Sequence, residues 1–390
     1  MAKIISLVLT AVALLVFWQA LPAKPLTEIS QSIKHPYAAA ITPQAGESRP
    51  LLSDGQKELY DVVKNGLMQS NPEILVRRFS YEEQDIQDIM WYIMQDSPEI
   101  FWVEWKWDVR SQDDGFVIIP TYNFSKEEVA SKSSELEKSV SALLTLAQSE
   151  GVKSDLDKVR FVHDHLIEDC VYIEDESPAL HTAYGAIVEH HTVCDGYTQA
   201  ARLLLTRMGI ECHYVEGTAT SKNNTQGHAW NIVKVDGKYH HLDITWDDPD
   251  HMNDNNEVTN VVSYSYFLRG DEEIKLDHTI ENKTPLPACE EYGYFEKVGL
   301  SGATFKDISD NLISALFENV KKDRYYIQFR ITDTAEYEKI RGSFNYAMID
   351  LVDGVNKELK KAGLDSRVYD QSCKNYPSRD TLLVVFNKDE

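Results

Sequence analysis

Three residues of this chain carry the side chains that nucleophilic acyl chemistry requires. Cys194 occurs in TVCDGY, His228 in GHAWN and Asp243 in HLDITWDDP. A thiol attacks a carbonyl carbon when a neighbouring imidazole accepts its proton, and a carboxylate orients that imidazole. The residue types and their contexts therefore predict a Cys-His-Asp catalytic triad.

The segment that follows His228 predicts a β-hairpin. Asp236-Gly237 lies between two β-prone runs, AWNIVKV and KYHHLDITW, and this dipeptide favours a two-residue turn. Val235 is then expected to pair with Lys238. A hairpin with this register folds the chain back and carries Asp243 toward His228.

Continued pairing predicts which side chains meet across the hairpin. His228 lies opposite Thr245, and Trp230 lies opposite Asp243, so His228 and Asp243 become diagonal neighbours on one face. Diagonal positions are roughly 7–8 Å apart at the backbone, which lets a carboxylate reach an imidazole N–H. The other face is expected to pack on the core and carries Val233, Val235, Leu242 and Ile244.

The residues after Cys194 predict a helix. Apolar residues recur with helical spacing from Ala200 to Met208, and Gly209 is a typical C-terminal cap. Cys194 is therefore expected at the helix N-terminus, where the dipole and free N–H groups favour a thiolate. Asp195 has two interpretations: its carboxylate opposes a low thiol pKa, or it caps the helix.

The region from about Asp157 to Pro249 resembles the transglutaminase-like superfamily, in the branch found in bacterial secreted and surface proteins. The resemblance rests on KVRFVHDHLIEDCVYI together with the three motifs above. It implies an α+β fold with a papain-like core, in which a helix bearing the cysteine packs on an antiparallel sheet bearing the histidine and aspartate. It also implies that Cys194 is the nucleophile, His228 the general base and acid, and Asp243 the orienting acid.

The resemblance leaves the reaction open, because its members include amide acyltransferases, cysteine peptidases or amidases, and proteins of no known activity. The expected function is thiol-dependent acyl transfer on protein or peptide amides through a Cys194 thioester, either cross-linking or deamidation. A cysteine peptidase or amidase acting on surface or cell-wall peptides is one alternative. A non-catalytic surface interaction protein with a remnant triad is the other.

Aromatic residues and further histidines lie near the motifs. Tyr184, Trp230 and Trp246 are candidates for a second oxyanion donor or for the substrate cleft, although an aromatic residue in or near a strand more often packs in the core. The remaining histidines, among them His163 and His165, lack convincing zinc-ligand spacing. Neither a metal nor a cofactor is predicted.

The chain divides into five predicted parts. Residues 1–23 are a signal peptide or signal anchor, and residues 24–50 are a linker. A small α+β region occupies 51–151, the catalytic domain 152–290 and an α/β accessory domain 291–390. The protein is therefore expected to be exported, either secreted or held at the cell surface by its N-terminal segment, its only expected membrane attachment.

Composition narrows the range of partners. The net charge of −24 argues against binding to nucleic acid or to an anionic membrane surface, which leaves a protein or peptide substrate as the expected partner. Five cysteines are an odd number for an exported protein, and Cys194 is the natural unpaired one. The sequence does not determine the pairing of Cys170, Cys212, Cys289 and Cys373, nor the oligomeric state.

Overall fold

The computed structural model describes residues 48–77, 81–173, 175, 177–221, 224–248, 261–342, 344–378 and 380–388. The predicted signal segment and nearly all of the predicted linker lie outside these residues. Within the described ranges, no helix is both long enough and apolar enough to span a bilayer. Residues 44–390 form one compact unit, and the predicted boundaries within it stay predictions.

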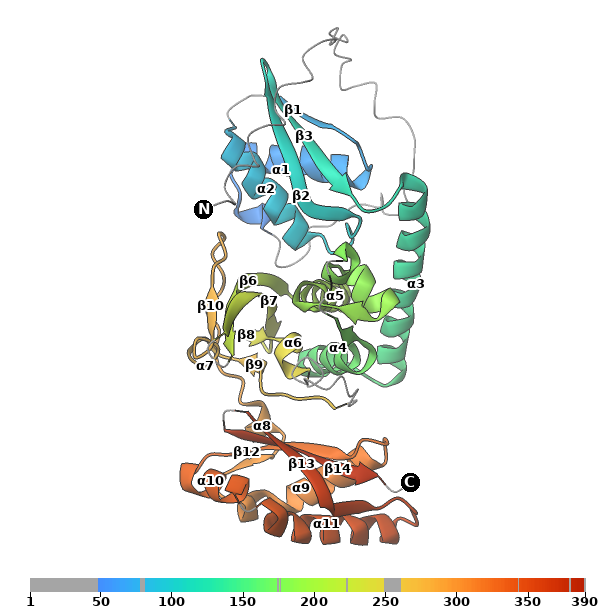
Figure 1. The fold of residues 1–390 in the computed structure, drawn as a ribbon, viewed down its shortest axis with the longest axis vertical. Helices are drawn as coiled ribbons and strands as arrows, with labels where there is room; N and C mark the ends of the chain where they lie inside the picture. Colours follow the sequence, from blue (N-terminus) through green and yellow to red (C-terminus); the bar gives the residue numbers. More distant parts are fainter. Residues whose placement is uncertain are drawn as a thin grey trace, which may run out of the picture. The chain divides into compact units, whose positions relative to one another are not determined.

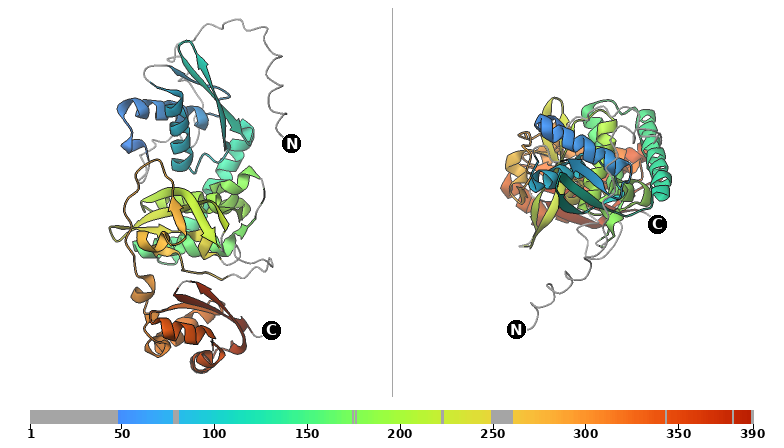
Figure 2. Two further views of the ribbon diagram at one scale, coloured as in Figure 1. Left: turned by 60° about the vertical axis from the view of Figure 1, so that its left-hand side comes forward. Right: turned by 90° about the horizontal axis from the view of Figure 1, so that it is seen from above.

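A five-stranded antiparallel sheet forms the centre of the structure, with strand order β10-β6-β7-β8-β9. Its strands are β6 (Cys212–Ser221), β7 (Asn224–Val235), β8 (Lys238–Leu242), β9 (Phe267–Arg269) and β10 (His278–Ile280). The helices α4 (Asp155–Asp169) and α5 (Cys194–Arg207) pack against the sheet, and Figure 2 (left) shows these green helices on one side of the yellow-green strands. This is the predicted α+β core.

The hairpin of β7 and β8 has the predicted turn and register. Asp236 and Gly237 both have positive φ, 52° and 82°, which two-residue hairpin turns of this type require. Val235 pairs with Lys238, and the ladder continues to the pair of Asn231 and Leu242. The side chains of Val233, Val235 and Leu242 are fully buried, so this face packs on the core as expected.

The chain leaves the hairpin earlier than predicted. Asp243 is the N-cap of a short helix, α6 (Ile244–Asp247), and its carboxylate accepts a hydrogen bond from the N–H of Trp246 at 3.1 Å. Because the cap starts a helix directly after Leu242, the strand pairs predicted beyond that residue are wrong. The pairs that do not form are Trp230 with Asp243 and His228 with Thr245.

The helix that begins with Cys194 agrees with the sequence. Val193 is its N-cap, so Cys194 is the first helical residue, and the helix ends at Arg207. Gly209 follows with φ 81°, the left-handed conformation expected of a C-terminal glycine. Cys194 therefore lies where backbone N–H groups are free of intrahelical partners.

A second sheet, of order β1-β3-β2, precedes the central sheet in the chain. It consists of β1 (Ile74–Arg77), β2 (Val103–Gln112) and β3 (Gly115–Tyr122), and the helices α1 (Asp54–Met68) and α2 (Glu83–Asp96) pack against it. Next comes α3 (Lys126–Ser149), which begins with a capping box between Ser125 and Glu128. Figure 1 shows α3 running from this sheet to the region of α4.

A third sheet, of order β11-β12-β14-β13, follows the central sheet in the chain. Its strands are β11 (Ser301–Gly302), β12 (Tyr326–Ile331), β13 (Val368–Ser378) and β14 (Thr381–Lys388), and the helices α9 (Phe305–Val320) and α11 (Phe344–Lys361) cover one face (Figure 1). The helix α10 (Thr334–Gly342) precedes α11 in the chain. The shorter elements are β4 (Val171–Tyr172), β5 (His191–Thr192), α7 (Asp271–Ile274), α8 (Tyr294–Lys297), the 3-10 helices at Arg49–Leu51 and Pro178–His181, and a π-helix at Gly185–Glu189.

Gly217 allows three central strands to pack closely. It pairs with His228 of β7 on one side and with Ile280 of β10 on the other. A Cβ atom here would lie 1.9 Å from the carbonyl oxygen of Thr279, a backbone atom that cannot move without shifting β10.

We therefore expect Gly217→Ala to lower the free energy of unfolding by about 1–3 kcal/mol, the usual cost of overpacking. Urea denaturation followed by tryptophan fluorescence measures the change. Gly227→Ala is the matched control, because Gly227 lies in β7 and its Cβ would meet no atom within 4 Å. Equal stability of the two variants would contradict the close packing of β6 and β10.

Candidate active site

Cys194 is partly buried at the start of α5, and its thiol interacts with the backbone N–H groups of Ala229 and Asp195. Burial and, to a smaller extent, the carboxylate of Asp195 raise the pKa of this thiol to about 12, although the two N–H groups act in the opposite direction. Cys194 therefore rests as a neutral thiol. Its proton has to leave during attack, which requires a base beside it.

His228 is the histidine next to Ala229 in β7, and it is 8% exposed. Its Nε2 lies 2.7 Å from Oδ2 of Asp243. Because an ionised carboxylate only accepts hydrogen bonds, Nε2 carries the proton and Nδ1 has a free lone pair. The tautomer is thus the one in which Nδ1 can take a proton from a thiol.

Asp243 is fully buried and receives three hydrogen bonds. Oδ2 accepts from Nε2 of His228 and, at 3.0 Å, from Nε2 of His278, while Oδ1 accepts from the N–H of Trp246. Burial alone would raise the pKa of the Asp243 carboxyl, but His228 and His278 outweigh it and hold the pKa well below its usual range. Asp243 is therefore an anion held in one orientation.

Sequence reasoning missed His278. It lies on β10, 35 residues after Asp243, and reaches the site only because β10 pairs with the far edge of β6. No periodicity or turn signal connects the two positions in the chain. The only local sign was the Asp277-His278 dipeptide, because Asp277 also binds the ring, at 2.6 Å through Nδ1.

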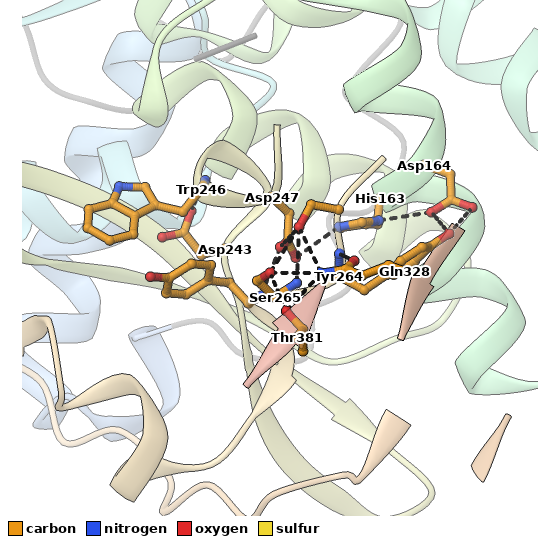
Figure 3. A network of polar contacts seen from close by, with 11 residues as sticks. His163, Asp164, Asp243, Trp246, Asp247, Tyr264, Ser265, Gln328 and Thr381 are labelled. Atoms are coloured by element: carbon orange, nitrogen blue, oxygen red, sulfur yellow. Dashed lines mark hydrogen bonds and ion pairs between the residues drawn. The ribbon is translucent and has the colours of Figure 1, made fainter. Parts of the chain in front are cut away.

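A second histidine, His163, binds the C-terminal end of α6, as His278 binds Asp243 at the N-terminal end. Nδ1 of His163 lies 2.9 Å from Asp164 and Nε2 lies 3.2 Å from Asp247, the last residue of α6. Figure 3 shows the His163 ring between these two carboxylates. Burial lowers the pKa of His163, yet the two carboxylates dominate and raise it to about 9.

The network around Asp247 continues into the C-terminal sheet. Oδ1 of Asp247 accepts a hydrogen bond from the N–H of Tyr266 at 2.8 Å. In the same segment, the buried Gln328 of β12 accepts from the N–H of Tyr264 at 2.6 Å and donates to the hydroxyl of Ser265 at 2.9 Å (Figure 3). The amide of Gln328 also donates to Thr381 at 3.1 Å. The third sheet thus holds the segment that binds α6.

A cleft of about 630 Å³ opens over the thiol and the imidazole. Trp91 of α2 and Trp105 of β2 form one wall, opposite Gly217 and Thr218 of β6. The N-terminal sheet thus contributes directly to the cleft. A larger cavity, of about 860 Å³ between α4 and β12, contains none of the predicted triad residues.

The cleft carries more acidic than basic side chains. Its acidic residues are Glu104, Asp195, Glu216 and Glu281, and its basic residues are Lys106, His181 and His228. Glu216 is fixed at 2.7 Å from Trp91 Nε1. Asp195 accepts from Tyr214 at 2.5 Å and from His181 at 2.7 Å, so its carboxylate is held in the cleft, where its charge raises the pKa of the Cys194 thiol.

Comparison with known families agrees with this geometry. Residues 144–244, which include Cys194, His228 and Asp243, match the family model of the Transglutaminase-like superfamily. These residues form a transglutaminase-like domain. No curated protein matches the chain.

Three solved structures share limited similarity with the chain. A proposed cysteine protease from Cytophaga hutchinsonii is 16% identical with a TM-score of 0.25, over 36% of this chain and 61% of that one. A proposed protease from Parabacteroides distasonis is 14% identical with a TM-score of 0.22, over 36% of this chain and 35% of that one. A TGase is 12% identical with a TM-score of 0.26, over 44% of this chain and 50% of that one. This chain therefore spans less than two thirds of each.

The aromatic candidates occupy different places around the transglutaminase-like domain. Tyr184 lies outside the cleft, where its hydroxyl donates to Glu135 at 2.7 Å. Trp230 is buried and stacks on His228 with 5.8 Å between ring centroids, but its indole N–H donates to His241. The ring of Trp246 lies 6.0 Å from that of His228. Trp230 and Trp246 thus pack around the imidazole.

Among the described residues, two clusters bring potential metal ligands within 4.8 Å of one another: His228, Asp243 and His278, and His241, Asp271 and Cys289. The second cluster does not fit a metal. An indole N–H only donates, so Nδ1 of His241 must accept from Trp230, and Nε2 must carry the proton that it shares with Asp271 at 3.0 Å. In the first cluster, the two Nε2 atoms that face Asp243 likewise carry protons.

The charge of Asp195 is expected to slow the alkylation of the Cys194 thiol, which can be tested. We expect Asp195→Asn to accelerate alkylation of Cys194 by iodoacetamide at pH 8 by about tenfold, the change that accompanies a pKa lowered by one. Mass spectrometry of the peptide containing Cys194 separates its reaction from that of the other cysteines.

Glu281→Gln is the control for Asp195→Asn, because it removes a different negative charge from the cleft wall. Its alkylation rate should stay within about twofold of the unaltered protein, the scale of a distant screened charge. Equal rates in the two variants would show that Asp195 has no specific effect on the thiol.

Proposed function

We propose that the protein is a thiol-dependent acyltransferase that acts on protein or peptide amides through a thioester on Cys194. The observation that carries this proposal is that the thiol at the start of α5 lines the same cleft as an imidazole that Asp243 holds in the required tautomer. His228 and Cys194 both line the cleft, where a substrate can reach them.

The reaction follows from the positions of the protons. Nδ1 of His228 takes the proton of Cys194 as the sulfur attacks the carboxamide carbon. The carbon–nitrogen bond then breaks, and the departing ammonia or amine takes that proton from His228, which leaves the acyl group on sulfur. A second amine or water attacks the thioester after losing its proton to His228, and the thiol is released with a proton from the imidazole.

The charge of the cleft supports an amine as the second substrate. Carboxylates concentrate a cationic primary amine near the thioester, and the faces of Trp91 and Trp105 favour the same charge. Transfer to water, which gives deamidation or peptide hydrolysis, uses the same thioester and is the other outcome of the assay below. We also place the reaction outside the cell, which the uncharged run from Ile4 to Ala23 supports.

The proposal predicts that Cys194→Ala has no acyl-transfer activity, because no thioester can form. Asp243→Asn should lower kcat on the order of 10³-fold or more, as the amide no longer favours the productive tautomer of His228. Incorporation of a fluorescent primary amine into a glutamine-containing protein, measured beside ammonia release, separates transfer from hydrolysis.

Cys289→Ser is the control thiol variant, because Cys289 lies away from the cleft, with its sulfur 3.7 Å from the carbonyl oxygen of Pro287. It should retain the activity of the unaltered protein. Full activity in Cys194→Ala would refute the proposed nucleophile, and full activity in Asp243→Asn would refute the role of the carboxylate.

A further inference from the structure

We propose that His278 is a charged positioning residue of the active site, which keeps His228 neutral and able to accept the proton of Cys194. This inference rests on the proposed function, since it assigns His278 a part in activating that same thiol. Its evidence is the position of His278 between two carboxylates and beside the imidazole of His228.

The contacts of His278 require a charged ring. Nε2 lies 3.0 Å from Asp243 and Nδ1 lies 2.6 Å from Asp277, so both nitrogens face carboxylate oxygens. Two ionised carboxylates only accept, and therefore each nitrogen must carry a hydrogen, which makes the ring an imidazolium. Burial lowers the pKa of His278, but the hydrogen bonds to Asp243 and Asp277 outweigh this and raise it.

The surroundings of His278 contain no other formal charge among the described contacts. The neighbouring histidines are His228, with 5.4 Å between ring centroids, and His241, whose pKa burial lowers to about 4 so that it is neutral. Trp230, Trp246 and Tyr266 pack around the ring at 5.0, 4.7 and 5.6 Å. Because these rings pack closely around His278, solvent screens its charge only weakly.

The charge of His278 offsets that of Asp243. A lone buried carboxylate in contact with His228 would favour the protonated imidazole, which cannot accept a proton from the thiol. The cation of His278 on the same oxygen, Oδ2, opposes that protonation by like-charge repulsion. Asp243 can then orient His228 without holding it in the charged form at neutral pH.

His163 allows the effect of the His278 charge on His228 to be separated from the structural support of α6. It sits between Asp164 and Asp247 with the same use of its two nitrogens, and it holds α6 from the opposite end. Its described contacts include neither His228 nor Asp243. A variant of His163 thus removes a buried imidazolium and a support of α6 while leaving the charge beside His228 in place.

The test is the pH profile of Cys194 alkylation in the full chain, measured for His278→Gln, His278→Lys and His163→Gln. Alkylation through His228 as base declines at low pH, where the imidazole becomes protonated. In His278→Gln, which keeps a neutral donor to Asp243, we expect this decline to move to higher pH by about one unit, as judged from the close charge separation. His278→Lys restores a cation and should return the profile toward that of the unaltered protein.

His163→Gln should lower stability and leave the midpoint of the profile unchanged. An unshifted midpoint in His278→Gln, or an equal shift in His163→Gln, would overturn the proposal. If His278→Gln does not fold, the ring ¹⁵N resonances of His278 in the unaltered protein at pH 8 decide the matter, since a neutral ring would contradict the assignment.

Alkylation needs no substrate, so this test and the test of acyl transfer fail independently. A shifted profile without acyl transfer would leave His278 established and the proposed reaction refuted. Acyl transfer with an unshifted profile would leave the reaction established and the role of His278 refuted.

Discussion

The buried negative charge of Asp243 is the interaction on which the site depends. A carboxylate removed from water is strongly unfavourable unless donors surround it. Asp243 receives one donor from β7, one from β10 and one from the first turn of α6. Three separate elements must therefore be in place before the carboxylate is stable, and when they are, the imidazole of His228 is also in its working orientation.

The short helix α6 connects this charge to a larger part of the molecule. A helix of four residues has almost no stability of its own, because nucleation fixes several residues for a single hydrogen bond. Its two terminal carboxylates, Asp243 and Asp247, are each bound by a histidine that is also bound to the aspartate beside it in sequence. Ion pairs with His163 and His278 thus stabilise a helix that its own sequence cannot.

Local signals explain what the sequence predicted and what it did not. The turn at Asp236-Gly237 determines a register over its nearest pairs, and the caps around Cys194 define its helix, because both depend on neighbouring residues. Asp243 departs from the predicted strand because its side chain caps a helix, a competition that strand periodicity does not reveal. His278 reaches the site only through the pairing of β10 with β6. Trp91 and Trp105 reach it only because α2 and β2 lie against the cleft. For that reason the triad was predictable, whereas its electrostatic partner and the cleft wall were not.

The side chain of Gln328 gives the third sheet a part in this chemistry. Its amide satisfies the backbone N–H of Tyr264 and the hydroxyl of Ser265, in the segment whose next residue, Tyr266, binds Asp247. A chain that ended near residue 290 would present these groups to solvent, and water would compete for the hydrogen bonds that hold α6. The transglutaminase-like domain would then contain Cys194, His228 and Asp243, but it would lack the water-excluded hydrogen bonds that support α6. The geometry of this site is in that sense a property of the whole folded unit and depends on residues well beyond those that line the cleft.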